Sequence, residues 1–249
     1  MNRLLIASIV LTVPVLAQAD SPAFDRPGIG FSTQTLPAGA FSWEQGLPDV
    51  VHDSHEGSSS TLSSADTRVR VGLGSNVELQ LADAVYNRLV THDAVTTVDH
   101  GYGDLAVALK VALPPPAHAI SWALMGGVSL KTGQAPFRND SEEYSLAVST
   151  SLHVNDSETA GLYGGVVRSG HDTRYTLSPN FGWAVNDRLS AYVEGGYTFG
   201  HHMDKDEVAG GGLAWMAGKS VQLDLFGLHG LNSGSTTLQA GVGVSIYFP

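Results

Sequence analysis

The sequence predicts an all-β fold, a transmembrane antiparallel up-and-down β-barrel of about twelve strands. Three observations predict it. Apolar residues alternate with small or polar ones from residue 40 onward, the polar face of this pattern carries few charges, and short turns alternate with longer connections. Charged residues make up 15% of the 249 residues, against roughly 25% in ordinary soluble domains.

The first nineteen residues predict a cleaved signal peptide. An apolar run at residues 4–16 precedes an A-x-A cleavage motif at residues 17–19. A membrane-spanning helix needs about 20 apolar residues, and Pro14 interrupts this shorter run. We therefore expect an exported chain.

The remaining chain divides into two parts. We expect residues 20–39 to form a lead segment that is periplasmic or plug-like, and residues 40–249 to form the barrel. After residue 19 no apolar run reaches the length of a membrane helix.

Composition excludes several classes of site and partner. The chain has no Cys, so it has no disulfide framework, thiolate metal site or lipid-attachment cysteine. A formal net charge of −11 argues against nucleic acid as a partner, because such a surface needs clustered Lys and Arg. No cofactor is implied.

The alternation is clearest in the stretch RVRVGLGSNVELQL at residues 68–81. Its valines and leucines fall on one face, and its charged and amide side chains fall on the other. With Leu73 opposite Val77 across a three-residue turn, every apolar partner stays on one face. The same reasoning places Val185 opposite Leu189. We expect the apolar face to meet lipid and the polar face to line the barrel interior.

Further strands follow along the chain, separated by turn signals. Alternating runs lie at residues 105–113, 120–130, 144–152, 175–183, 189–199 and 237–248. Short turns lie at residues 74–76, 114–116, 155–157, 186–188 and 218–220, and other connections lie near residues 51–60, 89–100, 132–142, 169–173, 201–206 and 230–235. These eleven connections predict about twelve strands, with both chain ends and the short turns on the periplasmic side.

The composition of the polar face distinguishes this barrel from a soluble one. It holds Gly, Ala and Ser where a soluble surface would show Lys and Glu, so a soluble lipocalin-like barrel is the weaker alternative. Aromatic residues on the apolar face near strand ends predict the girdles of a membrane barrel. They are Trp43, Trp122, Trp183, Trp215, Tyr144, Tyr175, Phe41, Phe181 and Phe248.

Two stretches resemble a known family. Residues 25–32 (DRPGIGFS), followed by LPAG at 36–39 and WEQGLPD at 43–49, resemble the opening of the outer-membrane transporter family named after the MetA pathway of phenol degradation. Residues 101–105 (GYGDL) with Lys110 resemble it as well. The resemblance implies a porin-like barrel in the bacterial outer membrane. It also implies outer-membrane lipid, periplasmic chaperones, the barrel assembly machinery and a small-molecule solute as partners.

In a channel, the chemistry lies in the side chains that line the lumen. Charges of both signs across a narrow lumen would create a transverse field that filters small polar or zwitterionic solutes. The same charges could instead form a network that plugs a barrel of about twelve strands. The predicted lining residues are Glu44, Arg68, Arg70, Glu78, Gln80, Asp104, Lys110, Lys131, Arg174, Asn180, Tyr192, Glu194, Gln222 and Asp224.

Histidines on the predicted outer connections form a second group. Imidazole and carboxylate groups can bind zinc, copper or nickel, although no spacing here matches a defined site. The candidate ligands are His52, His55, His201 and His202.

The sequence thus predicts an outer-membrane, porin-like channel for passive transport of small solutes, either aromatic or polar. A plugged structural or metal-binding barrel is the alternative. An outer-membrane lipid hydrolase is a third class, but no G-x-S-x-G or H-E-x-x-H motif occurs. Only His153, near Ser149 and Ser151, resembles part of a catalytic cluster, so we expect no enzyme.

Overall fold

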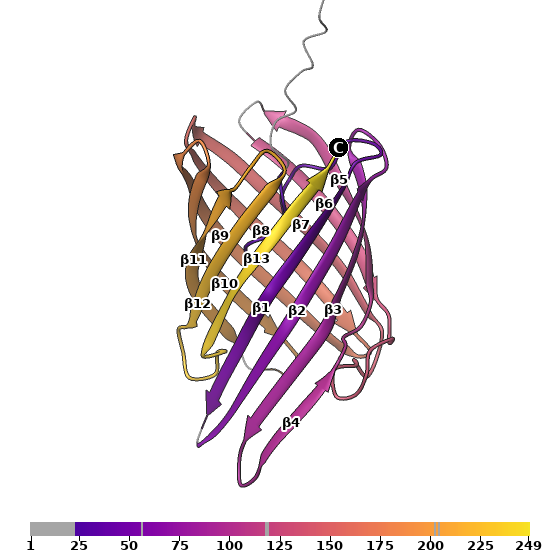
Figure 1. The fold of residues 1–249 in the computed structure, drawn as a ribbon, viewed down its shortest axis with the longest axis vertical. Helices are drawn as coiled ribbons and strands as arrows, with labels where there is room; N and C mark the ends of the chain where they lie inside the picture. Colours follow the sequence, from indigo (N-terminus) through magenta and orange to yellow (C-terminus); the bar gives the residue numbers. More distant parts are fainter. Residues whose placement is uncertain (1–22, 56, 118–119, 202, 204) are drawn as a thin grey trace, which may run out of the picture.

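A computed structural model of the chain describes residues 23–249 except 56, 118–119, 202 and 204. The predicted signal peptide lies outside the described residues. In the described part of the chain, no helix is long and apolar enough to cross a membrane. Strands account for most of this part and form one sheet (Figure 1).

The strands follow one another along the chain with short or longer connections. They are β1 (Phe41–His55), β2 (Ser58–Gly72), β3 (Val77–His92), β4 (Thr96–Gly101), β5 (Ala106–Ala117), β6 (Ile120–Ser129), β7 (Glu143–Asn155), β8 (Glu158–Ser169), β9 (Asp172–Asn186), β10 (Leu189–Gly200), β11 (Asp206–Met216), β12 (Val221–Gly230) and β13 (Leu238–Phe248).

The sheet closes on itself as an antiparallel barrel. Strand β1 pairs with both β2 and β13, and β2 also pairs with β3. Strand β3 pairs with β4 along residues 87–92 and with β5 along residues 77–82. Because β4 and β5 share one position beside β3, the thirteen described strands make a twelve-stranded barrel. The predicted fold class is confirmed.

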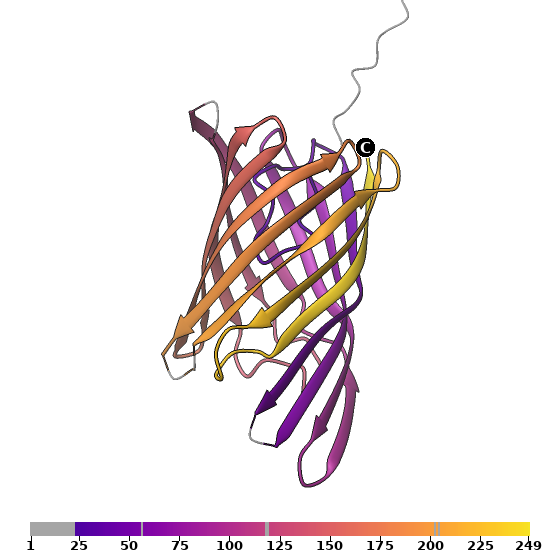
Figure 2. The same ribbon diagram turned by 90° about the vertical axis from the view of Figure 1, so that its left-hand side faces the viewer.

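The two ends of the barrel differ. The C-terminus lies at the end that carries only short turns, which is the periplasmic end in outer-membrane barrels (Figure 1). At the opposite end the β1–β2 and β3–β4 hairpins project beyond the other strands (Figure 2).

The residue pairing at the β2–β3 turn is the predicted one, whereas the pairing at the β9–β10 turn is not. The Leu73 amide donates to the Val77 carbonyl at 2.9 Å, as expected from the pattern. The prediction for the second turn is wrong, because Leu189 pairs with Asn186. The Asn186 Oδ1 accepts from the amides of Arg188 and Leu189 at 2.9 and 3.0 Å, which tightens the turn.

The faces are inverted relative to a soluble protein. Leu73 and Leu109 are 55% and 50% exposed, whereas Arg70, Glu78 and Lys110 are fully buried. The apolar side chains therefore point outward and the charged ones inward, as an outer-membrane barrel requires. Aromatic rings stack at the strand ends, for example Phe41 on Phe248 with centroids 4.3 Å apart.

Residues 23–40 run inside the barrel before β1 begins (Figure 2). Two small apolar clusters hold this stretch, which we call the lumen segment. Phe31 packs with Ala123 and Ala147 of the wall. In the second cluster, Phe24 and Leu36 pack with Ala40 and with Tyr247 of β13.

Candidate channel constriction

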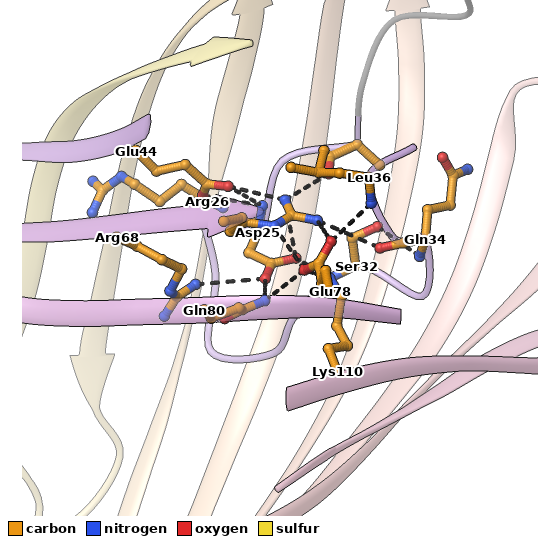
Figure 3. Close-up of polar contacts among 12 residues, drawn as sticks. Asp25, Arg26, Ser32, Gln34, Leu36, Glu44, Arg68, Glu78, Gln80 and Lys110 are labelled. Atoms are coloured by element: carbon orange, nitrogen blue, oxygen red, sulfur yellow. Dashed lines mark hydrogen bonds and ion pairs between the residues drawn. The ribbon is translucent and has the colours of Figure 1, made fainter. Parts of the chain in front are cut away.

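Asp25 of the lumen segment is held by donors from the barrel wall (Figure 3). Its side chain is fully buried. Lys110 Nζ donates to Oδ1 at 2.9 Å, and Gln80 Nε2 donates to Oδ2 at 2.7 Å. The Ser32 amide also donates to Oδ1, at 3.0 Å. One carboxylate thus accepts three hydrogen bonds from three separate parts of the chain.

Arg70 lies at the centre of the same cluster. Its Nε and Nη2 donate to the two carboxylate oxygens of Glu78 at 2.9 and 3.0 Å, and its Nη1 donates to Glu44 at 3.0 Å. Nη1 also donates to the Ala23 carbonyl at 2.8 Å and lies 3.5 Å from Asp25 Oδ1. The guanidinium therefore links the wall to the lumen segment.

Strand register places these groups together. Strands β1, β2, β3 and β5 are neighbours, and inward positions recur at every second residue. Glu44 pairs with Arg68 across β1 and β2, and Glu78 pairs with Lys110 across β3 and β5. Since cross-strand partners lie side by side, opposite charges meet on the same lumen face.

Arg26 binds a different part of the wall. Its Nη1 and Nη2 donate to the two oxygens of Asp49 at 2.6 and 2.9 Å, a bidentate geometry. Nη2 also donates to Asp224 Oδ1 at 3.2 Å, and the Arg26 carbonyl accepts from Gln222 at 2.9 Å. Consecutive residues of the lumen segment thus bind a cationic cluster and an acidic cluster.

Two glycines of β13 leave room for this second cluster. A Cβ on Gly243 would lie 2.5 Å from Arg26 Nε, and a Cβ on Gly241 would lie 2.1 Å from Asp49 Oδ1. Both positions face inward, so larger residues would displace the ion pair.

Wall glutamates also bind the backbone of the lumen segment. Glu44 accepts from the Arg26 amide at 2.9 Å, and Glu194 accepts from the Ile29 amide at 3.0 Å. An irregular segment inside a barrel has amides that no strand partner satisfies. These wall carboxylates supply the missing acceptors.

The charges of the wall shift the ionisation of the lumen segment. Burial by itself would raise the pKa of Asp25, but the positive charges of Arg70, Lys110 and Arg68 outweigh it and hold this pKa below its ordinary value. Burial would lower the pKa of Arg26, but its hydrogen bonds and ion pairs with Asp49 and Asp224 raise it. Both side chains are charged near neutral pH.

A cavity of about 390 Å³ lies against this cluster. Its lining includes Asp25, Arg26 and Arg68, together with two acidic residues of the wall, Asp66 and Asp83. The Arg68 side chain is 34% exposed and its Nη1 lies 3.8 Å from Asp25 Oδ2. Arg68 is therefore the cation of the cluster that a dissolved molecule meets first.

Nine of the predicted lining residues meet the lumen segment. Those around Asp25 or the nearby backbone of the segment, including the Leu36 amide, are Glu44, Arg68, Arg70, Glu78, Gln80 and Lys110, and those around Arg26 and Ile29 are Gln222, Asp224 and Glu194.

Of the other five, Asn180 and Tyr192 lie beside Glu194, and Asp104 lines the same cavity as Asp25. Asn180 and Tyr192 are on β9 and β10. Arg174 lies near the far rim, with Nη2 4.0 Å from Glu143 Oε1. Asp104 accepts from the backbone amides of residues 133 and 139, and Lys131 is exposed in the connection after β6 and donates to a carbonyl there.

Sequence reasoning missed Asp25, Arg26 and Asp49 as site residues. Asp49 was missed because a bulge between Gly46 and Asp49 shifts the alternation of β1 and turns this side chain inward. The sequence did contain a signal that could have identified Asp25 and Arg26. A charged Asp-Arg pair in a segment expected to be plug-like would need partners of opposite charge in the lumen.

The candidate metal ligands do not form a site in the described residues. His52 Nδ1 lies 2.9 Å from Thr61 Oγ1, and His55 Nε2 lies 2.7 Å from Asp53 Oδ1. His201 lines a separate rim cavity, and His202 lies outside the described residues. No group of three or more His, Cys, Asp or Glu side chains suited to a metal occurs among the residues that the structure describes.

The family described as "Putative MetA-pathway of phenol degradation" matches residues 24–248. The chain belongs to this family. The match includes the lumen segment as well as the whole barrel, so both parts are features of the family's sequence pattern. No curated protein matches the chain at a significant level.

Solved structures share the barrel at low sequence identity. An outer membrane channel from Pseudomonas putida F1 has a TM-score of 0.70 at 13% identity, covering 90% of this chain and 99% of that one. The KdgM porin has a TM-score of 0.56 at 12% identity, and the NanC porin 0.54 at 8%; each match covers 84% of this chain and 99% of the other. The fold is that of outer-membrane barrels.

Proposed function

We propose that this protein is an outer-membrane, porin-like channel for the passive transport of small polar solutes, closed in this structure by its lumen segment. The apolar outer face meets outer-membrane lipid. Displacement of the lumen segment opens the passage. The proposal assigns the chain no enzymatic activity and no cofactor.

The observation that carries the proposal is the way in which the lumen segment is bound. The barrel closes through its own strand pairs without this segment. Asp25 and Arg26 are held by side-chain ion pairs and hydrogen bonds, which water or a charged solute can replace. A channel whose gate is bound through such exchangeable contacts can open without unfolding its wall.

The similar structures support the same class of function. Their names describe an outer membrane channel and two porins. Their identity with this chain is too low to transfer a substrate, so the choice of solute has to come from the lumen itself.

Planar-bilayer conductance tests the proposal. We expect the wild-type barrel to give rare or small steps, and the Asp25→Ala/Arg26→Ala double variant to give frequent, larger steps, because both charged anchors of the lumen segment are lost. Thr33→Ala is the matched control, since it removes one hydrogen bond, to Ser121 at 2.7 Å, and no charge. Absence of discrete steps in all three proteins would favour a permanently plugged, structural barrel.

Liposome swelling with sugars, amino acids and aromatic acids then identifies the solutes that pass. The double variant should admit polar solutes faster than the wild type. Equal swelling rates for the two proteins would contradict a closing role for the lumen segment.

A further inference from the structure

We propose that the constriction is a two-ended binding site for a small zwitterion, for which Asp25 and Arg26 serve as a tethered stand-in. The inference rests on the proposed function and specifies its substrate class. The ligand would carry a carboxylate at one end and a guanidinium or ammonium group at the other.

The carboxylate end of the site is built almost entirely by the wall. Lys110 Nζ and Gln80 Nε2 donate to Asp25 at 2.9 and 2.7 Å, with Arg70 Nη1 at 3.5 Å and Arg68 Nη1 at 3.8 Å. All four donors belong to strands β2, β3 and β5. A free carboxylate in place of Asp25 would meet the same donors.

The cationic end is also part of the wall. Asp49 of β1 accepts two hydrogen bonds from Arg26, and Asp224 of β12 accepts a third. The inward-facing Gly241 and Gly243 leave the space in which the Arg26 side chain lies. The planar, bidentate geometry suits a guanidinium, and a primary ammonium can bind the same two carboxylates as a point charge.

Charge balance requires both ends of the ligand. Without Asp25, the cationic cluster has Arg68, Arg70 and Lys110 against two carboxylates, an excess of one positive charge. Without Arg26, Asp49 and Asp224 have no ion-pair partner among the described residues. A buried charge without a partner is strongly unfavourable. A solute that displaces the lumen segment must therefore replace one negative and one positive charge.

The dimensions restrict the ligand to a small molecule. The two stand-in residues are consecutive in the chain, so a single small molecule can replace both of their charged groups. The adjoining cavity of about 390 Å³ borders both of them and the partly exposed Arg68. An amino acid or a dipeptide is small enough for such a space and carries a carboxylate and a cationic group in one molecule.

Equilibrium binding to the full-length Asp25→Gly/Arg26→Gly variant tests the inference. The purified barrel is checked for folding by its heat-dependent gel shift and titrated with L-arginine or with agmatine, which lacks the carboxylate. We expect arginine to bind at least about tenfold more tightly than agmatine. Wild type and Thr33→Ala should bind neither, because the lumen segment fills the site. Equal affinities for the two probes, or arginine binding by the wild type equal to that of the variant, would overturn the inference.

The Asp25→Gly single variant provides a second measurement if the double variant does not fold. Acetate has the same CH₂–COO⁻ shape as the missing side chain, so it should raise the thermal midpoint of this variant and leave that of the wild type unchanged. Lack of such rescue would contradict the carboxylate end of the site. Neither measurement requires solute passage. The binding site can therefore be disproved while the conductance result stands, and the conductance experiment can fail while the binding results stand.

Discussion

Arg70 shows how the lumen accommodates buried charges. Its side chain has no solvent exposure and contacts three carboxylates, those of Asp25, Glu44 and Glu78. A buried ion pair does not by itself stabilise a fold more than apolar residues would, but removal of one partner leaves an uncompensated charge. The loss of stability when one charged side chain of this cluster is removed should therefore be larger for a buried side chain than for an exposed one.

Arg70→Met is expected to be strongly destabilising. Three buried carboxylates would lose their shared cation, which costs about 3–5 kcal/mol of unfolding free energy for a broken buried pair. Arg68→Met is the matched control, because Arg68 is partly exposed and 3.8 Å from its partner; its loss should be at most about 1 kcal/mol. Urea unfolding in detergent, followed by the heat-dependent gel shift, measures both. Similar losses for the two variants would contradict a burial-based difference.

Asp25 leads to a prediction about pH. Its pKa in the folded protein is lower than in the unfolded chain, for which the ordinary value is about 3.9. Its contribution to docking is therefore complete above that ordinary value and is lost only as the pH falls through the lower, folded pKa. A spin label on Thr35→Cys should give the same immobilised spectrum from pH 8 to pH 5. Release of the label within this range would show that other groups control docking, and Asp25→Asn should be mobile already at neutral pH.

Among the elements, the regular parts of the strands could be predicted and the irregular parts could not. Arg70, Glu78 and Lys110 follow simple alternation, so their inward direction follows from the sequence. Asp49 follows a bulge, and the break between β4 and β5 interrupts the strand beside β3. Both depend on pairing with distant strands, which a local pattern does not contain.

The end of β2 sets the path of the lumen segment into β1. The Gly39 amide donates to the Gly72 carbonyl at 2.9 Å, and a Cβ on Gly72 would lie 1.9 Å from the Pro37 carbonyl oxygen. Close approach of backbone therefore requires glycine at this position. A Cβ on the neighbouring Gly74 would meet no described atom within 4 Å, so this residue offers a control on the same hairpin.

Gly72→Ala should loosen the lumen segment, whereas Gly74→Ala should not. The added methyl group pushes residues 36–38 away from β2 and weakens the hydrogen bond from the Leu36 amide to Glu78, which is 2.8 Å long. The spin label on Thr35→Cys should become more mobile in the first variant only. Unchanged mobility in both variants would mean that the backbone contact at Gly72 does not position the segment.

For the molecule as a whole, the placement of the lumen segment was the part that sequence could not determine. Its residues alternate too little to predict a strand, and either a periplasmic or a plug-like position was consistent with them. The decisive contacts join residues that are far apart in the chain, such as Arg26 and Asp224. Only the closed barrel brings these partners within reach of one short segment.

A reversible covalent lock should show whether solutes pass only when the lumen segment moves. Thr33 Oγ1 lies 2.7 Å from Ser121 Oγ of β6, so cysteines at these two positions are close enough to form a disulfide. The chain has no other Cys to compete. Oxidised Thr33→Cys/Ser121→Cys barrels in liposomes should block solute passage, and a reducing agent should restore it, while Thr33→Cys alone should respond to neither treatment. Passage at the same rate in the oxidised and reduced states would show that solutes move around a fixed segment, and displacement would then not be the opening step.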